Sequence, residues 1–304
     1  MKKFASLVLF VFVAVVLVAC GDDDSSDFAT RPSGDSSSAC EDCDGSSSSE
    51  AKSSSSVASS SSGEQSSSSV AYVEPCRNDS VDTCEYGTLT DERDGQTYKT
   101  VTIGTQTWMA ENLNYAYTGV PYKYTYLDSS YTSDSTSWCY DNDPAKCTKY
   151  GRLYTWAAAM DSVGTWSTNG KGCGYGKRCT PTYPVRGVCP EGWHLPTKAE
   201  FETLFTAVCG SSTAGRMLKS TSGWNDSKGQ DGNGTDAYAF SALPAGYRDF
   251  YGNISLEGSR AYFWSSTERN SNYAYIMLLF YYDDYAYLEN YDKYYGYSVR
   301  CLKD

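Results

Sequence analysis

A serine-rich tract restricts the folded part of this 304-residue chain to its C-terminal region. Residues 21–70 hold 22 serines, in blocks such as 46–49 and 53–56, and few apolar side chains. Such a segment cannot bury enough apolar area to offset the entropy lost on ordering. We therefore expect a disordered, acidic tether over residues 21–75. Residues 76–304 remain, and that length is sufficient for one sizeable hydrophobic core in a single domain.

The first 20 residues have the pattern of an export signal. Two lysines precede an apolar run over residues 4–18, and Ala19-Cys20 follow. This pattern predicts a secretory signal peptide over residues 1–20, because the run is short for a transmembrane helix. The ending Leu-Val-Ala-Cys resembles the bacterial lipobox, whose cysteine is lipidated; the alternative is an ordinary signal peptide with an incidental cysteine. Because the next residue is Gly21 and not aspartate, the resemblance implies a lipid anchor in the outer membrane, and we expect the domain at the cell surface.

Charge and histidine content exclude several classes of function. The formal net charge is −12, and residues 1–75, with 4 basic and 11 acidic side chains, supply −7 of it, which leaves −5 for the domain. A basic surface for nucleic acid is therefore not expected. The single histidine, His194, argues against histidine metal clusters and against Ser–His or Cys–His catalysis, and we interpret it as structural.

The cysteines predict a disulfide framework. Apart from Cys20 there are eleven, and an exported chain meets an oxidising environment. Cys40 and Cys43 have redox or metal spacing but lie in the tether without a second pair. Because eleven is an odd number, one cysteine must stay outside the disulfides, and Cys209 is our candidate. Sequence alone does not determine connectivity. The candidate pairs are Cys76 with Cys84, Cys139 with Cys147, Cys173 with Cys179, and Cys189 with Cys301.

Hydrophobic periodicity predicts two main helices and several short strands. Alternation around Gly104-Thr105 predicts a β-hairpin over residues 98–109. Apolar residues at helical spacing predict a helix over residues 150–161. A second helix should begin after Thr197, which forms a capping box with Glu200, and end at Gly210. Further strands are expected at 239–243, 262–266, 274–280 and 297–302. The pattern predicts one α+β domain with mostly antiparallel strands.

Six motifs follow one another along the predicted domain. They are Trp108–Leu113, Gly151–Ala159, Val188–Thr197, Phe240–Gly246, Phe263–Glu268 and Ser298–Cys301. Together they resemble the Fibrobacter succinogenes major paralogous domain family over residues 94–304. Members of that family are typically exported, often as lipoproteins, and have no assigned activity.

A more remote resemblance concerns the fold. The segment 193–201 and the Val-Arg-Cys ending at 299–301 are similar to the formylglycine-generating-enzyme and C-type-lectin type of domain. This resemblance implies a C-type-lectin-like α+β domain whose termini meet near a shared sheet. It also implies a long irregular region between the second helix and the last strands.

Calcium is the metal for which the predicted domain offers candidate ligands. Trp224-Asn225-Asp226 matches a tripeptide that C-type lectins use for calcium and sugar, but no Glu-Pro-Asn motif precedes it. Carboxylate and amide oxygens suit calcium, although the spacing is not that of an EF-hand. The alternative is a cluster of turn residues with no metal, and no other cofactor is expected. The weak candidates are Asn225, Asp226, Asp231, Asn233 and Asp236.

The sequence does not predict an enzyme. Formylglycine-generating enzymes use a reactive cysteine pair, and nothing here marks one. Asp283 and Asp284 are adjacent in a strand-like stretch, so their side chains should point to opposite faces instead of converging on a cleft. Kinship with that enzyme class is therefore the least favoured alternative.

Tyrosine density marks the candidate binding surface. Residues 261–297 contain 11 of the 28 tyrosines, with several Asn and Asp residues among them. Tyrosine provides a large contact area with few rotatable bonds, and its neighbours provide adaptable hydrogen bonds. We therefore predict a non-catalytic binding or adhesion module for a polysaccharide or a surface protein; the alternative is a structural scaffold without a specific ligand. The candidate residues are Tyr281, Tyr282, Tyr285, Tyr287, Tyr291, Tyr294 and Tyr295.

Overall fold

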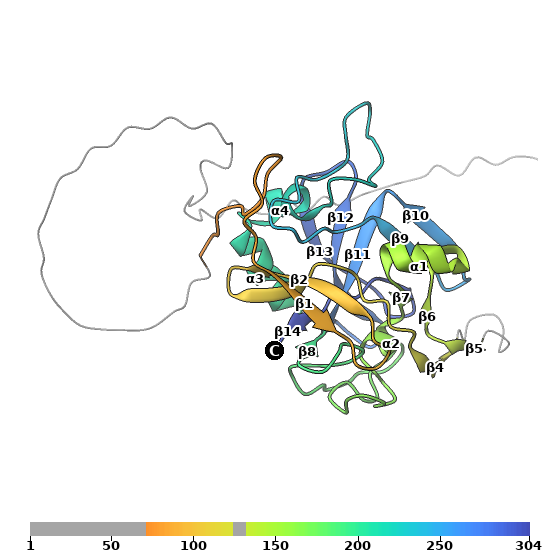
Figure 1. Cartoon of the computed structure of the whole chain (residues 1–304). Helices are drawn as coiled ribbons and strands as arrows, with labels where there is room; N and C mark the ends of the chain where they lie inside the picture. The colour runs from red at the N-terminus through yellow and green to blue at the C-terminus, as the bar shows by residue number, and fades with distance from the viewer. Residues whose placement is uncertain (1–70, 124–131) are drawn as a thin grey trace, which may run out of the picture. The chain divides into compact units, whose positions relative to one another are not determined.

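The computed structural model of the chain describes residues 71–123 and 132–304 (Figure 1). The predicted signal peptide, Cys20 and the Cys40/Cys43 pair lie outside the described residues. The helices are η1 (Tyr140–Asn142), α1 (Pro144–Tyr150), α2 (Trp156–Ala159), α3 (Lys198–Ala207) and α4 (Ser211–Leu218). The strands are β1 (Tyr86–Thr90), β2 (Thr97–Ile103), β3 (Gln106–Met109), β4 (Thr118–Lys123), β5 (Thr132–Ser135), β6 (Ser137–Trp138), β7 (Leu153–Tyr154), β8 (Trp193–His194), β9 (Ala245–Arg248), β10 (Ile254–Glu257), β11 (Arg260–Glu268), β12 (Tyr273–Phe280), β13 (Ala286–Asp292) and β14 (Leu302–Lys303).

The beginning and the end of the domain meet in one antiparallel sheet of order β1-β2-β3-β14-β8. The predicted hairpin is confirmed as β2 and β3, joined at Gly104, whose φ is +61°. In the last strand, Leu302 pairs with Trp108 on one side and with His194 on the other (Figure 1). The combination of helices with antiparallel sheets confirms the α+β class.

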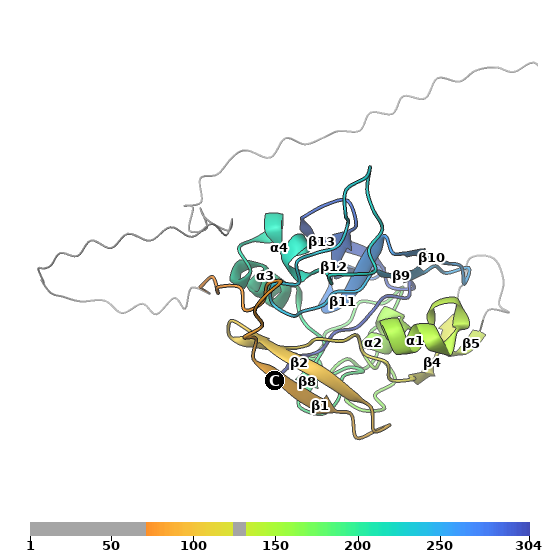
Figure 2. The ribbon, with the colours of Figure 1, turned by 45° about the horizontal axis from the view of Figure 1, so that its top comes forward.

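A second sheet, of order β11-β12-β13, separates two hydrophobic cores. Because side chains alternate along a strand, Trp264 and Ile276 enter one core while Phe263 and Met277 enter the other. The second core also contains the buried faces of α3 and α4, which lie side by side on that flank of the sheet (Figures 1 and 2). The sheet is therefore covered on both faces.

Helix α3 begins where its sequence predicts, and it ends at Ala207, before the predicted stop at Gly210. The Thr197 hydroxyl accepts from the Glu200 N–H, and the Glu200 carboxylate accepts from the Thr197 N–H, so the capping box is complete. Its expected apolar stripe is buried, as the four side chains Phe201, Leu204, Phe205 and Val208 show.

The helix predicted over residues 150–161 is wrong. Helix α1 ends at Tyr150, a short strand follows, and α2 begins only after Thr155 caps it. Gly151 explains the interruption, because it has a φ of +70° and a Cβ there would lie 2.7 Å from the Leu113 carbonyl oxygen. Leu153, Trp156 and Met160 are buried all the same. The periodicity therefore predicts the buried positions correctly, although these residues do not form one continuous helix.

Two of the four later strands are confirmed, and the others need correction. Residues 262–266 and 274–280 lie within β11 and β12. Residues 239–243 form an irregular loop instead of a strand, because Ala239 and Ser241 have φ values of +54° and +53°. Of 297–302, only Leu302 belongs to a strand, while Tyr297 and Ser298 form isolated bridges.

The four predicted disulfides are present in the structure. They join Cys76 to Cys84, Cys139 to Cys147, Cys173 to Cys179 and Cys189 to Cys301. Cys209 lies outside these four bonds, as expected. Among the described residues, no helix has the length and apolar character needed to span a membrane.

Candidate ligand-binding surface

Strand β13 and the turns on either side of it carry all seven candidate tyrosines. Tyr281, Tyr282 and Tyr285 lie in the turn after β12, Tyr287 and Tyr291 lie on β13, and Tyr294 and Tyr295 lie in the turn that follows. None of the seven is buried. Tyr282 and Tyr285 are 54% and 48% exposed, and the other five are half-buried.

The first group of rings, which we call the turn cluster, consists of Phe280, Tyr281, Tyr282, Tyr285 and Tyr287. Phe280 lies 5.1 Å from Tyr282 and 5.5 Å from Tyr287, measured between ring centroids. Asp283 fixes the turn, because its carboxylate accepts from the Tyr285 N–H at 2.7 Å and from the Tyr287 hydroxyl at 2.5 Å. Asp283 and Asp284 thus lie in a turn, and not in the strand-like stretch expected from the sequence.

The second group, which we call the loop cluster, places half-buried rings on a buried aromatic base. Tyr262 and Tyr297 are buried and stacked, with centroids 4.6 Å apart and an interplanar angle of 8°. Tyr295 stacks on Tyr297 with centroids 5.8 Å apart, and Tyr291 and Tyr262 form a T-shaped pair with centroids 6.0 Å apart. Tyr247 contacts Tyr262, Tyr295 and Tyr297, so residues from three distant segments hold this cluster.

Arg260 connects the two clusters. Its guanidinium carbon lies 4.8 Å from the centroid of the Phe280 ring, and its Nη1 group donates to the Tyr262 hydroxyl at 3.1 Å. Burial, together with the Asp292 carboxylate, raises the pKa of Tyr295 to about 12. At neutral pH the hydroxyl therefore stays protonated and can donate a hydrogen bond. The surface combines ring faces, neutral hydroxyl groups and the Asp283 carboxylate.

The candidate calcium ligands are engaged with protein groups. The buried Asp236 carboxylate accepts from Arg77 at 2.8 Å and from the Ser241 N–H and hydroxyl at 2.6 Å each. Asn225 donates to Ser259, Asp231 accepts from the Asn233 N–H, and Asn233 accepts from the Trp224 N–H. Asp226 is exposed. Across residues 71–123 and 132–304, no three His, Cys, Asp or Glu side chains lie together in a way that could hold a metal ion.

His194 joins three elements. Its Nδ1 atom lies 2.7 Å from Asp304 Oδ1, and its Nε2 atom lies 3.0 Å from Glu200 Oε1. Burial lowers the pKa of His194, but the hydrogen bonds to the two carboxylates outweigh burial and leave the pKa above its usual value. The side chain thereby ties β8 and α3 to the C-terminus.

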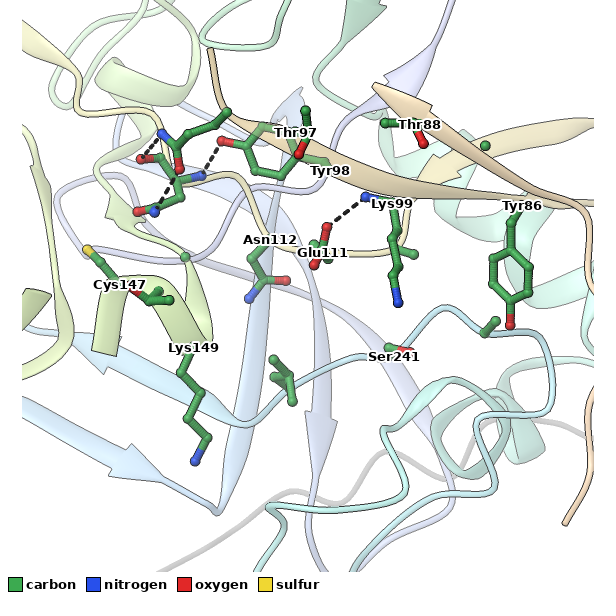
Figure 3. A pocket seen from close by; sticks show the side chains of 18 of the residues that line it. Tyr86, Thr88, Thr97, Tyr98, Lys99, Glu111, Asn112, Cys147, Lys149 and Ser241 are labelled. Carbon is green, nitrogen blue, oxygen red and sulfur yellow. Dashed lines mark hydrogen bonds between the residues drawn. The ribbon is translucent and has the colours of Figure 1, made fainter. Parts of the chain in front are cut away.

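A cavity of about 840 Å³ lies beside the β1–β2 ribbon (Figure 3). Its walls come from five separate segments: residues 77–82, the ribbon, residues 110–114, the end of α1 and the loop 239–243. Sequence reasoning missed this cavity, because its polar residues are scattered and form no motif.

Comparison with known proteins gives one result. The model of the family described as "Fibrobacter succinogenes major domain" matches residues 101–303 of the chain. No curated protein and no solved structure matches it.

Proposed function

The chain belongs to the Fibrobacter succinogenes major domain family, and from that premise we propose that it is a non-catalytic binding module displayed at the cell surface. Its ligand is a polysaccharide or a surface protein. The module is held in the outer membrane by a lipid on Cys20, with residues 21–75 as its tether. The export signal and the four disulfides support this location, because disulfides persist in oxidising compartments.

The observation that carries the proposal is the access of the tyrosines to solvent, with Tyr282 and Tyr285 exposed and the other five half-buried. Seven of them lie on one strand and its turns, and none is buried. Tyrosine rings stack on sugar rings and on protein side chains, while their hydroxyl groups donate or accept hydrogen bonds. The buried Tyr262–Tyr297 stack restrains the rings of the loop cluster, so little side-chain entropy is lost when a ligand binds.

The arrangement of the termini supports a C-type-lectin-like fold as part of the proposal. The last strand, β14, lies between β3 and β8, so the two ends of the domain share a sheet, as the lectin resemblance implies. A structural scaffold is the second candidate, and the half-buried packing of five of the tyrosines favours it.

A binding screen separates these functions. The full-length chain is tested against a panel of soluble polysaccharides and surface proteins, with calcium and with a chelator, and each ligand is recovered and analysed for turnover. We expect saturable binding without change of the ligand. Absence of saturable binding across the panel would support the scaffold, and conversion of a ligand would overturn the non-catalytic assignment. A requirement for calcium would show that an ion takes part in binding, and substitution of the candidate ligands Asn225, Asp226, Asp231, Asn233 and Asp236 would then test whether they hold it.

A further inference from the structure

The cavity beside the β1–β2 ribbon has the size of a ligand site and an unusual balance of charge. Its volume of about 840 Å³ lies within the range of small-molecule sites. Lys99 of β2 and Lys149 of α1 both line it (Figure 3), and the Lys149 ammonium group also lies 4.5 Å from the centroid of the Tyr150 ring. In the part of the chain that the structure describes, neither ammonium group lies within ion-pair distance of a carboxylate.

A third cation lies directly behind the cavity wall. Arg300 is fully buried, and its guanidinium donates to Asn112 Oδ1 at 2.7 Å and to the Ser241 carbonyl at 3.2 Å. Asn112 and Ser241 both line the cavity, so only these two residues separate the Arg300 guanidinium from it. No carboxylate among the described residues pairs with Arg300, and burial lowers its pKa to about 9. The guanidinium thus remains charged at neutral pH, and the Asp236 and Glu111 carboxylates offset part of its charge from beyond ion-pair distance.

The carboxylates of the cavity offset these three cations only in part. Asp82 is already paired with Arg77 and accepts from the Tyr86 hydroxyl at 2.7 Å. Glu111 accepts from the Lys99 N–H at 2.6 Å and is the one lining carboxylate without an ion pair in the described structure. Positive charge therefore exceeds negative charge, although the chain as a whole is acidic.

The remaining lining favours a ligand with hydroxyl groups over a simple anion. Gln96 and Asn114 line the cavity and are held together, because the Asn114 amide donates to Gln96 Oε1 at 2.9 Å. The hydroxyls of Thr88, Thr97 and Thr148 and the half-exposed ring of Tyr86 complete a wall that suits a sugar.

We propose that this cavity binds an acidic saccharide. Lys99 contacts its carboxylate, Lys149 and Arg300 contribute attraction from a longer distance, and the hydroxyls of Thr88 and Thr97 bond to the hydroxyl groups of the sugar. The site is independent of the tyrosine surface, because the two share no residue, and it would remain if that surface proved to have no ligand.

The test is isothermal titration of the full-length chain with trigalacturonate and with its methyl ester, which has the same rings without the charge. We expect saturable binding of the acid and binding of the ester that is about tenfold weaker or more. The variant K99Q/K149Q should lose about tenfold or more in affinity for the acid, and T88V/T97V should weaken both ligands. The control K171Q/K228Q removes two exposed lysines outside the cavity and should bind like the wild type.

Three results would overturn the proposal: no binding of trigalacturonate, equal affinity for acid and ester, or equal loss in K99Q/K149Q and the control. Binding of free sulfate at the same site with the same affinity as trigalacturonate would also overturn it, because a simple anion site needs no sugar.

Discussion

Removal of the buried cation Lys293 should destabilise the domain far more than removal of an exposed one. The Lys293 side chain is 0% exposed, and its ammonium group donates to Glu268 Oε2 at 2.8 Å and to the carbonyls of Gly174 and Lys177 at 3.2 Å each. It also lies 4.3 Å from the Trp156 ring centroid. The residue thus ties the end of β13 to the loop closed by the Cys173–Cys179 disulfide.

The variant Lys293→Met leaves Glu268 nearly buried without its main partner. Loss of one member of a buried pair typically costs about 3–5 kcal/mol, because an uncompensated charge remains. Glu268 keeps the hydrogen bond from the Cys179 N–H at 3.2 Å and the ion pair with the exposed Arg178 at 3.7 Å. We therefore expect the free energy of unfolding to fall by about 2–4 kcal/mol. The double variant Lys293→Met/Glu268→Gln should recover part of this loss, because it buries no charge.

Urea unfolding of the oxidised protein measures these differences as changes in the free energy of unfolding. The matched control is Lys198→Met, which breaks an exposed pair with Glu202 and should cost less than about 1 kcal/mol. Equal losses in Lys293→Met and Lys198→Met, or no recovery in the double variant, would refute the reasoning.

Four further outcomes are expected. Gly215→Ala should lower the free energy of unfolding by about 1–3 kcal/mol, because its Cβ would lie 2.3 Å from the Tyr285 carbonyl oxygen; a neutral effect in urea unfolding would contradict this contact. Because the pKa of His194 is raised above its usual 6.5, its contribution to stability is complete below pH 6.5 and is lost as the pH rises through the folded-state pKa. Stability measured on both sides of that window should therefore fall with pH in the wild type, and a slope that persists in His194→Gln would reject the assignment. Replacement of Cys189 and Cys301 by serine opens the bond across 112 residues and should cost about 4–5 kcal/mol; peptide mapping that links either cysteine elsewhere would exclude the pair. Cys20→Ser should move the protein out of the detergent phase, and unchanged partition would show that no lipid anchors it.

The sequence predicted those elements whose signals are local. The capping box that starts α3 and the Gly104 turn of the first hairpin each depend on residues a few positions apart. Three disulfides join cysteines 6 or 8 positions apart, and the fourth was inferred from the cysteines that remained.

The predictions of secondary structure were wrong where tertiary contacts override a local sequence pattern. Residues 150–161 have helical periodicity, but the Leu113 carbonyl lies so close to Gly151 that the chain turns there. Helix α4 was not expected, because its Ser, Thr and Gly residues are weak helix formers; it is stabilised by Ala214 and Leu218 in the core.

The candidate surface was predictable only in part. Tyrosine density located residues 281–295, whereas their support by Tyr247 and Tyr262 depends on pairing between distant segments. The cavity gave no signal, because Lys99, Lys149 and Arg300 come from three separate parts of the chain.

Affinity of the tyrosine surface for its ligand tests the central claim most directly. The polysaccharide of the panel that binds the wild type most tightly is titrated into the wild type, into Tyr282→Ala/Tyr285→Ala and into Tyr183→Ala. The last variant is the control, because it removes a ring that is 50% exposed and lies outside the surface. Each stacked ring contributes about 0.5–1.5 kcal/mol, so the double variant should bind about 5- to 150-fold more weakly, and Tyr183→Ala should bind like the wild type. Equal affinity of all three proteins for that polysaccharide would contradict a binding role for the surface.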